Sequence, residues 1–70
     1  MAEMKAEQNA EAVRPLLVSA AGAARVLGIG RTTIYELVKD GHLTPIHLRG
    51  CVRFSMYEIE QYVESLRRAA

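Results

Sequence analysis

The sequence lacks several features on which larger, secreted or membrane proteins rely. It contains no tryptophan, one phenylalanine and a single cysteine, Cys51. Because one cysteine cannot form an intramolecular disulfide, a reducing, cytoplasmic compartment fits the chain best. No stretch approaches the ~18 consecutive apolar residues of a membrane-spanning helix, and the first residues lack the apolar run of a secretory signal. The sequence therefore predicts a domain that is neither exported nor embedded in a membrane.

The charge is unevenly distributed, although its total is small. The 70 residues carry a formal net charge of +1, to which residues 1–12 contribute −2, residues 13–54 contribute +4 and residues 55–70 contribute −1. A basic middle between acidic ends favours a surface that faces a polyanion. The plainer interpretation is a basic face without a ligand, which is common in small domains.

The length allows one hydrophobic core and no more. Half of the 70 residues are hydrophobic, and a chain of this size buries only about 60% of its unfolded surface. Residues 1–14 are rich in Ala, Glu, Gln and Lys and have no regular apolar face, so they predict a flexible N-terminal tail. Residues 15–70 predict a single domain.

Two short helices joined by a glycine turn are predicted at the start of this domain. Ser19 is a suitable N-cap for a helix over residues 20–27, and Gly28 suits the left-handed position that ends it. A second helix over residues 31–39 presents an apolar stripe made of Ile34, Leu37 and Val38. This outline is that of a helix-turn-helix, with a generic helical hairpin as the alternative.

A hairpin and a third helix complete the expected domain. After Gly41 the apolar residues alternate, which predicts two strands, over 45–48 and 51–54, joined by a tight turn at Arg49 and Gly50. We expect the hairpin to pack on the helices through Ile46, Leu48, Val52 and Phe54, with His47, Arg49 and Arg53 on the other face or the tip. Ser55 and Glu58 form a capping box for a helix to about Arg68. Its expected core stripe is Ile59, Tyr62, Val63 and Leu66.

This order of elements, read with particular residues, resembles the excisionase-type, MerR-like helix-turn-helix family. The residues that carry the resemblance are the pair Ala23-Ala24, the run Thr33-Ile34-Tyr35 in the second helix and Arg53-Phe54 before the last helix. The resemblance covers residues 16–66. It implies a mainly α fold, a winged helix-turn-helix with three helices and a two-stranded β-hairpin wing, that binds double-stranded DNA and needs no cofactor.

The resemblance also implies a biological role. Small members of the family are excisionases, which bind and bend attachment-site DNA cooperatively and direct a cognate integrase toward excision. A small MerR-like transcriptional regulator that binds promoter DNA is the alternative within this class. An alternative of another class is a protein-interaction module or antitoxin whose basic face meets an acidic protein.

The expected DNA-binding residues lie in the second helix and the wing. The family's pattern places contacts at Arg31, Thr32, Thr33, Tyr35, Glu36, His47 and Arg53, and the basic side chains of Lys39 and Arg49 add two more. Three residues depart from the family's pattern: Glu36, where Arg or Lys is common, Cys51, where a basic residue is common, and Gly22, where a helix-forming acid is frequent. Glu36 is expected either to accept a hydrogen bond from a cytosine amino group or to repel phosphate and hold a neighbouring arginine.

Several of these residues also suit a purely structural role. The two threonines suit capping in the first turn, Tyr35 suits packing against the wing, and Lys39 suits a solvated helix end. Arg31 stands at a helix N-terminus, where its charge opposes the helix dipole, which favours an outward contact with phosphate or guanine. His42, His47 and Cys51 lack the spacing of a metal site. The sequence shows no catalytic constellation, so neither an enzyme nor a metal protein is predicted.

Overall fold

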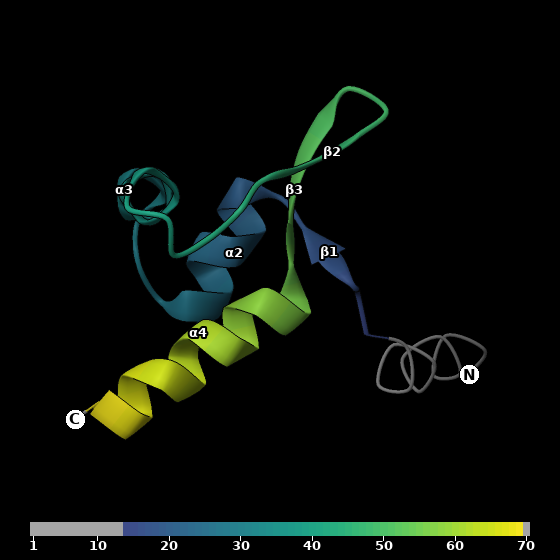
Figure 1. Cartoon of the computed structure of the whole chain (residues 1–70). Helices are drawn as coiled ribbons and strands as arrows, with labels where there is room; N and C mark the ends of the chain where they lie inside the picture. Colours follow the sequence, from purple (N-terminus) through teal and green to yellow (C-terminus); the bar gives the residue numbers. More distant parts are fainter. Residues whose placement is uncertain (1–13, 70) are drawn as a thin grey trace, which may run out of the picture.

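The computed structural model describes residues 14–69, which form three helices and a small antiparallel sheet (Figure 1). In chain order the elements are β1 (Leu17–Val18), α2 (Ala20–Leu27), α3 (Arg31–Lys39), β2 (Ile46–Leu48), β3 (Cys51–Ser55) and α4 (Met56–Ala69). The tail predicted over residues 1–14 lies, except for Arg14, outside the described residues. Within residues 14–69, no helix has the length and apolar character needed to cross a membrane.

The two predicted helices and their glycine turn are confirmed. The Ser19 hydroxyl accepts a hydrogen bond from the Gly22 N–H at 3.1 Å and so caps α2. Gly28 adopts φ 73°, a left-handed conformation that glycine adopts without steric cost. The next amide, that of Ile29, donates to the Ala24 carbonyl at 2.9 Å, and Ile29 packs against the core. The chain then turns directly into α3.

The sheet has one strand more than the two predicted for the wing. β3 lies in the middle, with β2 on one side and β1 on the other, and both neighbours are antiparallel to it. The short β1 pairs Leu17 with Ser55 and Val18 with Phe54. β2 and β3 form the predicted hairpin, and its turn residues Arg49 and Gly50 have φ of 50° and 83°, as in a type I′ turn.

The expectation that the apolar residues of the hairpin share one face is wrong. A two-residue turn pairs Leu48 with Cys51, so every even-numbered residue of β2 lies opposite an odd-numbered residue of β3. Directly paired residues project from the same face of a sheet. One face therefore carries Ile46, Leu48, Cys51 and Arg53, and the other carries His47, Val52 and Phe54. Of the four apolar residues expected to pack on the helices, only Phe54 is buried.

The core lies where the three helices meet the base of β3. Its buried residues come from every helix, from β3 and from the loop after α3: Ala20, Ala23, Ala24, Ile34, Leu43, Phe54 and Ile59. The expected core stripe of α4 is correct for Ile59, which is buried, and for Tyr62, which packs partly buried against the core. It is wrong for Val63 and Leu66, which are 37% and 50% exposed. The 14-residue α4 runs past the 8-residue α2, so its last turns have little to pack against (Figure 1).

The start of α4 also fixes the loop that leads into the wing. The Ser55 hydroxyl accepts from the Glu58 N–H at 3.2 Å, which confirms the predicted N-cap. The Glu58 carboxylate does not return this bond, as a full capping box requires, but accepts from the Thr44 amide at 3.0 Å. The same carboxylate thus ties the loop after α3 to α4, close to the base of β2.

Replacing Ser55 by alanine tests the importance of this cap. We expect Ser55→Ala to lower the free energy of unfolding by about 1 kcal/mol, because an N–H of the first turn of α4 loses its acceptor. Ser65→Ala is the control, since that hydroxyl donates to the Tyr62 carbonyl within the helix and alanine is the better helix former. Urea denaturation followed by circular dichroism measures both, and equal stabilities for the two variants would contradict the assignment.

Candidate nucleic-acid interface

The solvent-facing side of α3 is formed by two parallel rows of side chains. Residues four apart lie on the same side of a helix. The first row is Arg31, Tyr35 and Lys39, and the second is Thr32 and Glu36. All five are exposed, and they are called here the α3 face. The opposite side of the helix packs against the core through Ile34, Leu37 and Val38.

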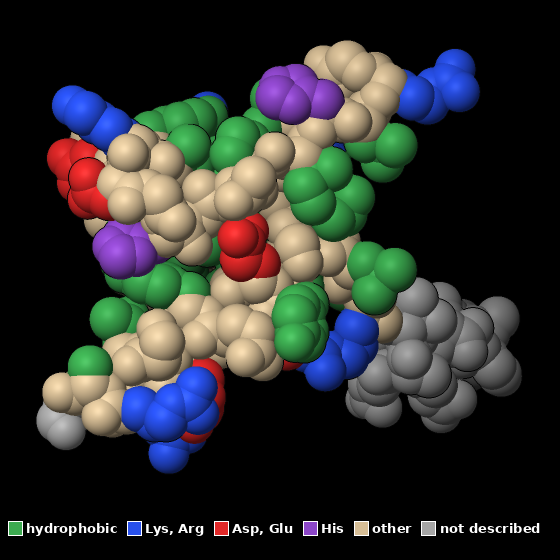
Figure 2. All heavy atoms as spheres, viewed as in Figure 1, with side chains coloured by type: hydrophobic (Ala, Val, Ile, Leu, Met, Phe, Trp, Pro, Cys, Tyr) green, Lys and Arg blue, Asp and Glu red, His purple; other side chains and the backbone are tan. Residues whose placement is uncertain are grey.

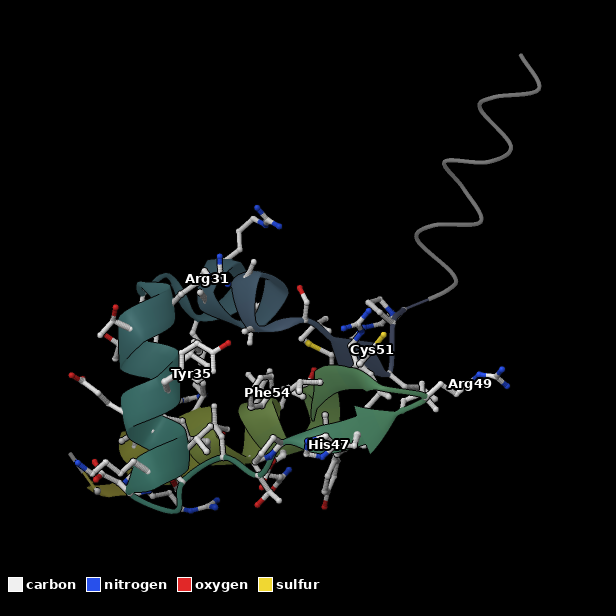
Figure 3. All side chains as sticks on the ribbon, turned by 90° about the horizontal axis from the view of Figure 1, so that it is seen from above. Arg31, Tyr35, His47, Arg49, Cys51 and Phe54 are labelled. Atoms are coloured by element: carbon white, nitrogen blue, oxygen red, sulfur yellow. The ribbon has the colours of Figure 1, made fainter. Side chains whose placement is uncertain are left out.

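The α3 face is not covered by the rest of the described chain. α3 packs against α2, and Ile34, with no exposed surface, anchors it there. Figure 3 looks onto α3 and the wing together, with Arg31 and Tyr35 on the helix and Arg49 at the distant tip of the hairpin. Tyr35 is 50% exposed, so it is not a residue of the core, although half of its surface is covered.

Thr33 lies apart from the other predicted contact residues of α3. It is half-buried and lines a groove of about 330 Å³ between α3 and α4. The other lining residues of that groove are apolar or aromatic: Leu27, Ile29, Leu37, Tyr62, Val63 and Leu66. The structure therefore brings Arg31, Thr32, Tyr35, Glu36 and Lys39 together and separates Thr33 from them.

The wing carries the remaining predicted residues, on two faces and a tip. Arg49 is exposed at the tip and has φ 50°. This left-handed conformation is unfavourable for most residues other than Gly, Asn and Asp. Arg53 is half-buried, and its guanidinium donates to the Val52 carbonyl at 2.9 Å. His47 is exposed on the face opposite that of Arg53. Cys51 is exposed beside the turn.

The cations of α3 and the wing are not neutralised by carboxylates within residues 14–69. The ion pairs in this part of the chain join Arg14 to Glu60 at 2.7 Å, and Arg67 and Arg68 to Glu64 at 3.6 and 3.8 Å. None of these pairs includes Arg31, Lys39, Arg49 or Arg53. On the face that Figure 2 shows, the Lys and Arg side chains lie apart from one another, one of them at the end of the wing, and form no continuous patch.

Glu36 also lacks an ionic partner among the described residues. It stands one helical turn after Thr32 and three residues before Lys39. One expectation was that Glu36 holds a neighbouring arginine in place. Within residues 14–69, no ion pair joins Glu36 to an arginine. In this described part of the chain, no hydrogen bond or ion pair engages the Glu36 carboxylate in the middle of the α3 face.

Sequence reasoning missed one group of exposed residues at this interface. Ile46, Leu48 and Val52 were expected to pack on the helices but lie on the surface of the wing. The length of the turn could have predicted that these residues do not share one face, because a two-residue connection determines which residues of the two strands are paired.

Comparison with known proteins gives one match. A family model described as a helix-turn-helix domain matches residues 17–67, from β1 to the last turns of α4. No curated protein and no solved structure matches the chain. The matched residues include α2, α3, the wing and most of α4. The three helices and the small antiparallel sheet agree with a winged form of the helix-turn-helix fold. The chain therefore belongs to the helix-turn-helix domain family, a class of DNA-binding domains.

Proposed function

We propose that the protein recognises specific sequences in double-stranded DNA, with α3 in the major groove and the wing at the adjacent minor groove or backbone. The observation that carries the proposal is the exposure of the whole α3 face on a helix whose other side is anchored in the core. A helix presented in this way can enter the major groove without rearrangement of the fold.

The chemistry of the α3 face suits both the backbone and the bases of DNA. Arg31 and Lys39 stand at the two ends of one row, where they meet phosphates or, for Arg31, a guanine. Tyr35 donates to a phosphate from between them. Thr32 contacts a phosphate or a thymine methyl group, and Glu36 accepts from a base amino group. Thr33, which is half-buried in the groove between α3 and α4, is not among these proposed contacts.

The wing adds cations beyond the reach of α3. Arg49 and Arg53 approach phosphates or the minor groove, and His47 reaches the backbone from the other face. A single module of this size covers only about 600–1,000 Å² of protein surface on DNA. Its binding alone is therefore weak and salt-sensitive, and several copies bound side by side supply the affinity and specificity.

The biological role that fits these properties best is that of an excisionase. Such a protein binds repeated sites beside an attachment site, bends the DNA and favours excision by a cognate integrase. This role is supported by the family resemblance of residues 16–66 and by the single small domain. A role in the cytoplasm as a MerR-like transcriptional regulator is the second candidate, since a promoter-binding protein would present the same α3 face.

Sequencing of genomic fragments retained by the purified protein distinguishes these roles. We expect clustered, repeated sites next to an attachment site and an integrase gene. Isolated sites at promoters would favour the regulator instead. Failure to retain any fragment above competitor DNA would contradict DNA recognition and favour the protein-interaction module or antitoxin.

Replacing Arg31 by alanine tests the orientation of α3. We expect Arg31→Ala to weaken duplex binding and to reduce the slope of log affinity against log salt by about 0.9, the value for one lost phosphate contact. Arg67→Ala is the matched control, because Arg67 is paired with Glu64 on α4. Fluorescence anisotropy over a salt series measures both slopes. A reduced slope for Arg67→Ala, or an unchanged one for Arg31→Ala, would contradict the orientation.

Replacing Glu36 by glutamine tests the role of its carboxylate in sequence recognition. We expect Glu36→Gln to bind mixed-sequence DNA several-fold more tightly, because a charge that repels phosphate is removed. We also expect it to lose ~1–3 kcal/mol of discrimination at one base pair of the selected site. Selection from random duplexes followed by competition assays measures both effects, with Glu64→Gln on α4 as the control. If the two variants select the same site with equal stringency, Glu36 does not read a base.

A further inference from the structure

The two strands of the wing are connected to the first turn of α4 in different ways. β3 continues directly into the helix, since Ser55 ends the strand and Met56 begins α4. β2 is exposed along its whole length, and the chain reaches it from α3 rather than from α4. The start of β2 is held to α4 by the hydrogen bond of 3.0 Å from the Thr44 amide, two residues before the strand, to the Glu58 carboxylate. This bond therefore anchors the second strand of the wing.

The loop between α3 and β2 is held at three successive residues. The His42 ring lies against that of Tyr62, with 5.2 Å between their centroids, and Leu43 is buried in the core. Thr44 follows with its hydrogen bond to Glu58. Glu58 and Tyr62 are four residues apart and so lie on the same side of α4. One side of α4 thus holds the segment that joins α3 to the wing.

The position of the wing relative to α3 depends on this segment. α3 packs mainly against α2, and β2 packs mainly against β3, so neither is the main packing partner of the other. A hairpin of two strands is not rigid by itself and needs support from its neighbours. A duplex that must meet both elements at once is bound more tightly when their separation is fixed before binding.

We propose that Glu58 is a positioning residue for DNA binding, whose carboxylate fixes the wing relative to α3. This inference rests on the proposed DNA binding and adds a residue outside both the α3 face and the wing. Glu58 is half-buried, and its bond to the Thr44 amide is charge-assisted, which makes it one of the stronger hydrogen bonds of the described chain. Without that bond, part of the binding free energy is used to order the wing.

Two substitutions of Glu58 separate its hydrogen bond from its charge. Glu58→Ala removes both, whereas Glu58→Gln removes the charge and keeps a side-chain oxygen that accepts from the Thr44 amide. Glu60→Ala is the matched control, because it removes the same charge nearby on α4 from a side chain that pairs with Arg14. Urea denaturation followed by circular dichroism establishes that each variant is folded under the binding conditions.

The placement of the wing is measured first in the DNA-free protein. Cys51 is the one cysteine of the chain and is exposed beside the turn of the wing, so it takes a spin label directly. Glu36→Cys adds a second label on the exposed side of α3. Double electron–electron resonance gives the distribution of distances between the two labels. We expect a narrow distribution with Glu58 in place, the same distribution in Glu58→Gln and Glu60→Ala, and a broader one in Glu58→Ala.

The consequence for binding is measured by anisotropy with a labelled mixed-sequence duplex over a salt series. We expect Glu58→Ala to bind about fivefold more weakly than Glu60→Ala, equivalent to ~1 kcal/mol. The salt slope stays the same, because the complex contains the same phosphate contacts. Glu58→Gln binds as tightly as Glu60→Ala. In an Arg49→Ala background the loss on Glu58→Ala is smaller, since the wing then contributes less to binding.

Several results would overturn the inference. An unchanged distance distribution in Glu58→Ala would show that the bond does not place the wing, and a broader distribution with unchanged affinity would show that its placement does not matter for binding. An equal loss in Glu58→Gln would assign the effect to charge, and an undiminished loss in the Arg49→Ala background would assign it to the fold. If the wild type does not bind the duplex, the proposed function fails, whereas the distances in the DNA-free protein still show whether Glu58 places the wing.

Discussion

The structure depends on the burial of one side of α3. Ile34 has no exposed surface and packs among small alanines of α2, two of which, Ala23 and Ala24, are themselves buried. Small side chains allow the two helices to approach closely, and the left-handed Gly28 lets the chain turn within a few residues. Because the inward side of α3 is held against the core in this way, the polar side chains of the α3 face point toward solvent.

The wing is held by a second set of contacts that leaves its outer half free. Phe54 is fully buried at the base of β3, and the Glu58 carboxylate accepts from the Thr44 amide just before β2. The hairpin is therefore rigidly attached at one end and projects at the other. The helix and the hairpin are therefore the two exposed elements on which the proposed DNA interface is built.

Local patterns in the sequence predicted the elements well, while the faces they present depended on pairing and length. Capping residues and glycines gave the bounds of α2 and α3, since these signals act within a few residues. The faces of the hairpin were mispredicted because the apolar alternation was read in each strand alone, although the two-residue turn pairs Leu48 with Cys51. Val63 and Leu66 continue the apolar stripe of α4 beyond the end of its partner helix, and periodicity alone contains no information on where a partner ends. Thr33 was placed among the contact residues by the family resemblance alone, whereas in the structure it lines the groove between α3 and α4.

The arrangement of the two elements toward DNA can be observed directly by titrating the ¹⁵N-labelled protein with an unlabelled duplex and following the backbone amide resonances. If α3 and the wing face DNA together, the amides of residues 31–39 and 46–53 shift in parallel with increasing duplex, and those of residues 61–69 in α4 stay in place. Shifts concentrated in α4 and along the groove that contains Thr33, with residues 31–39 unaffected, would contradict the proposed face.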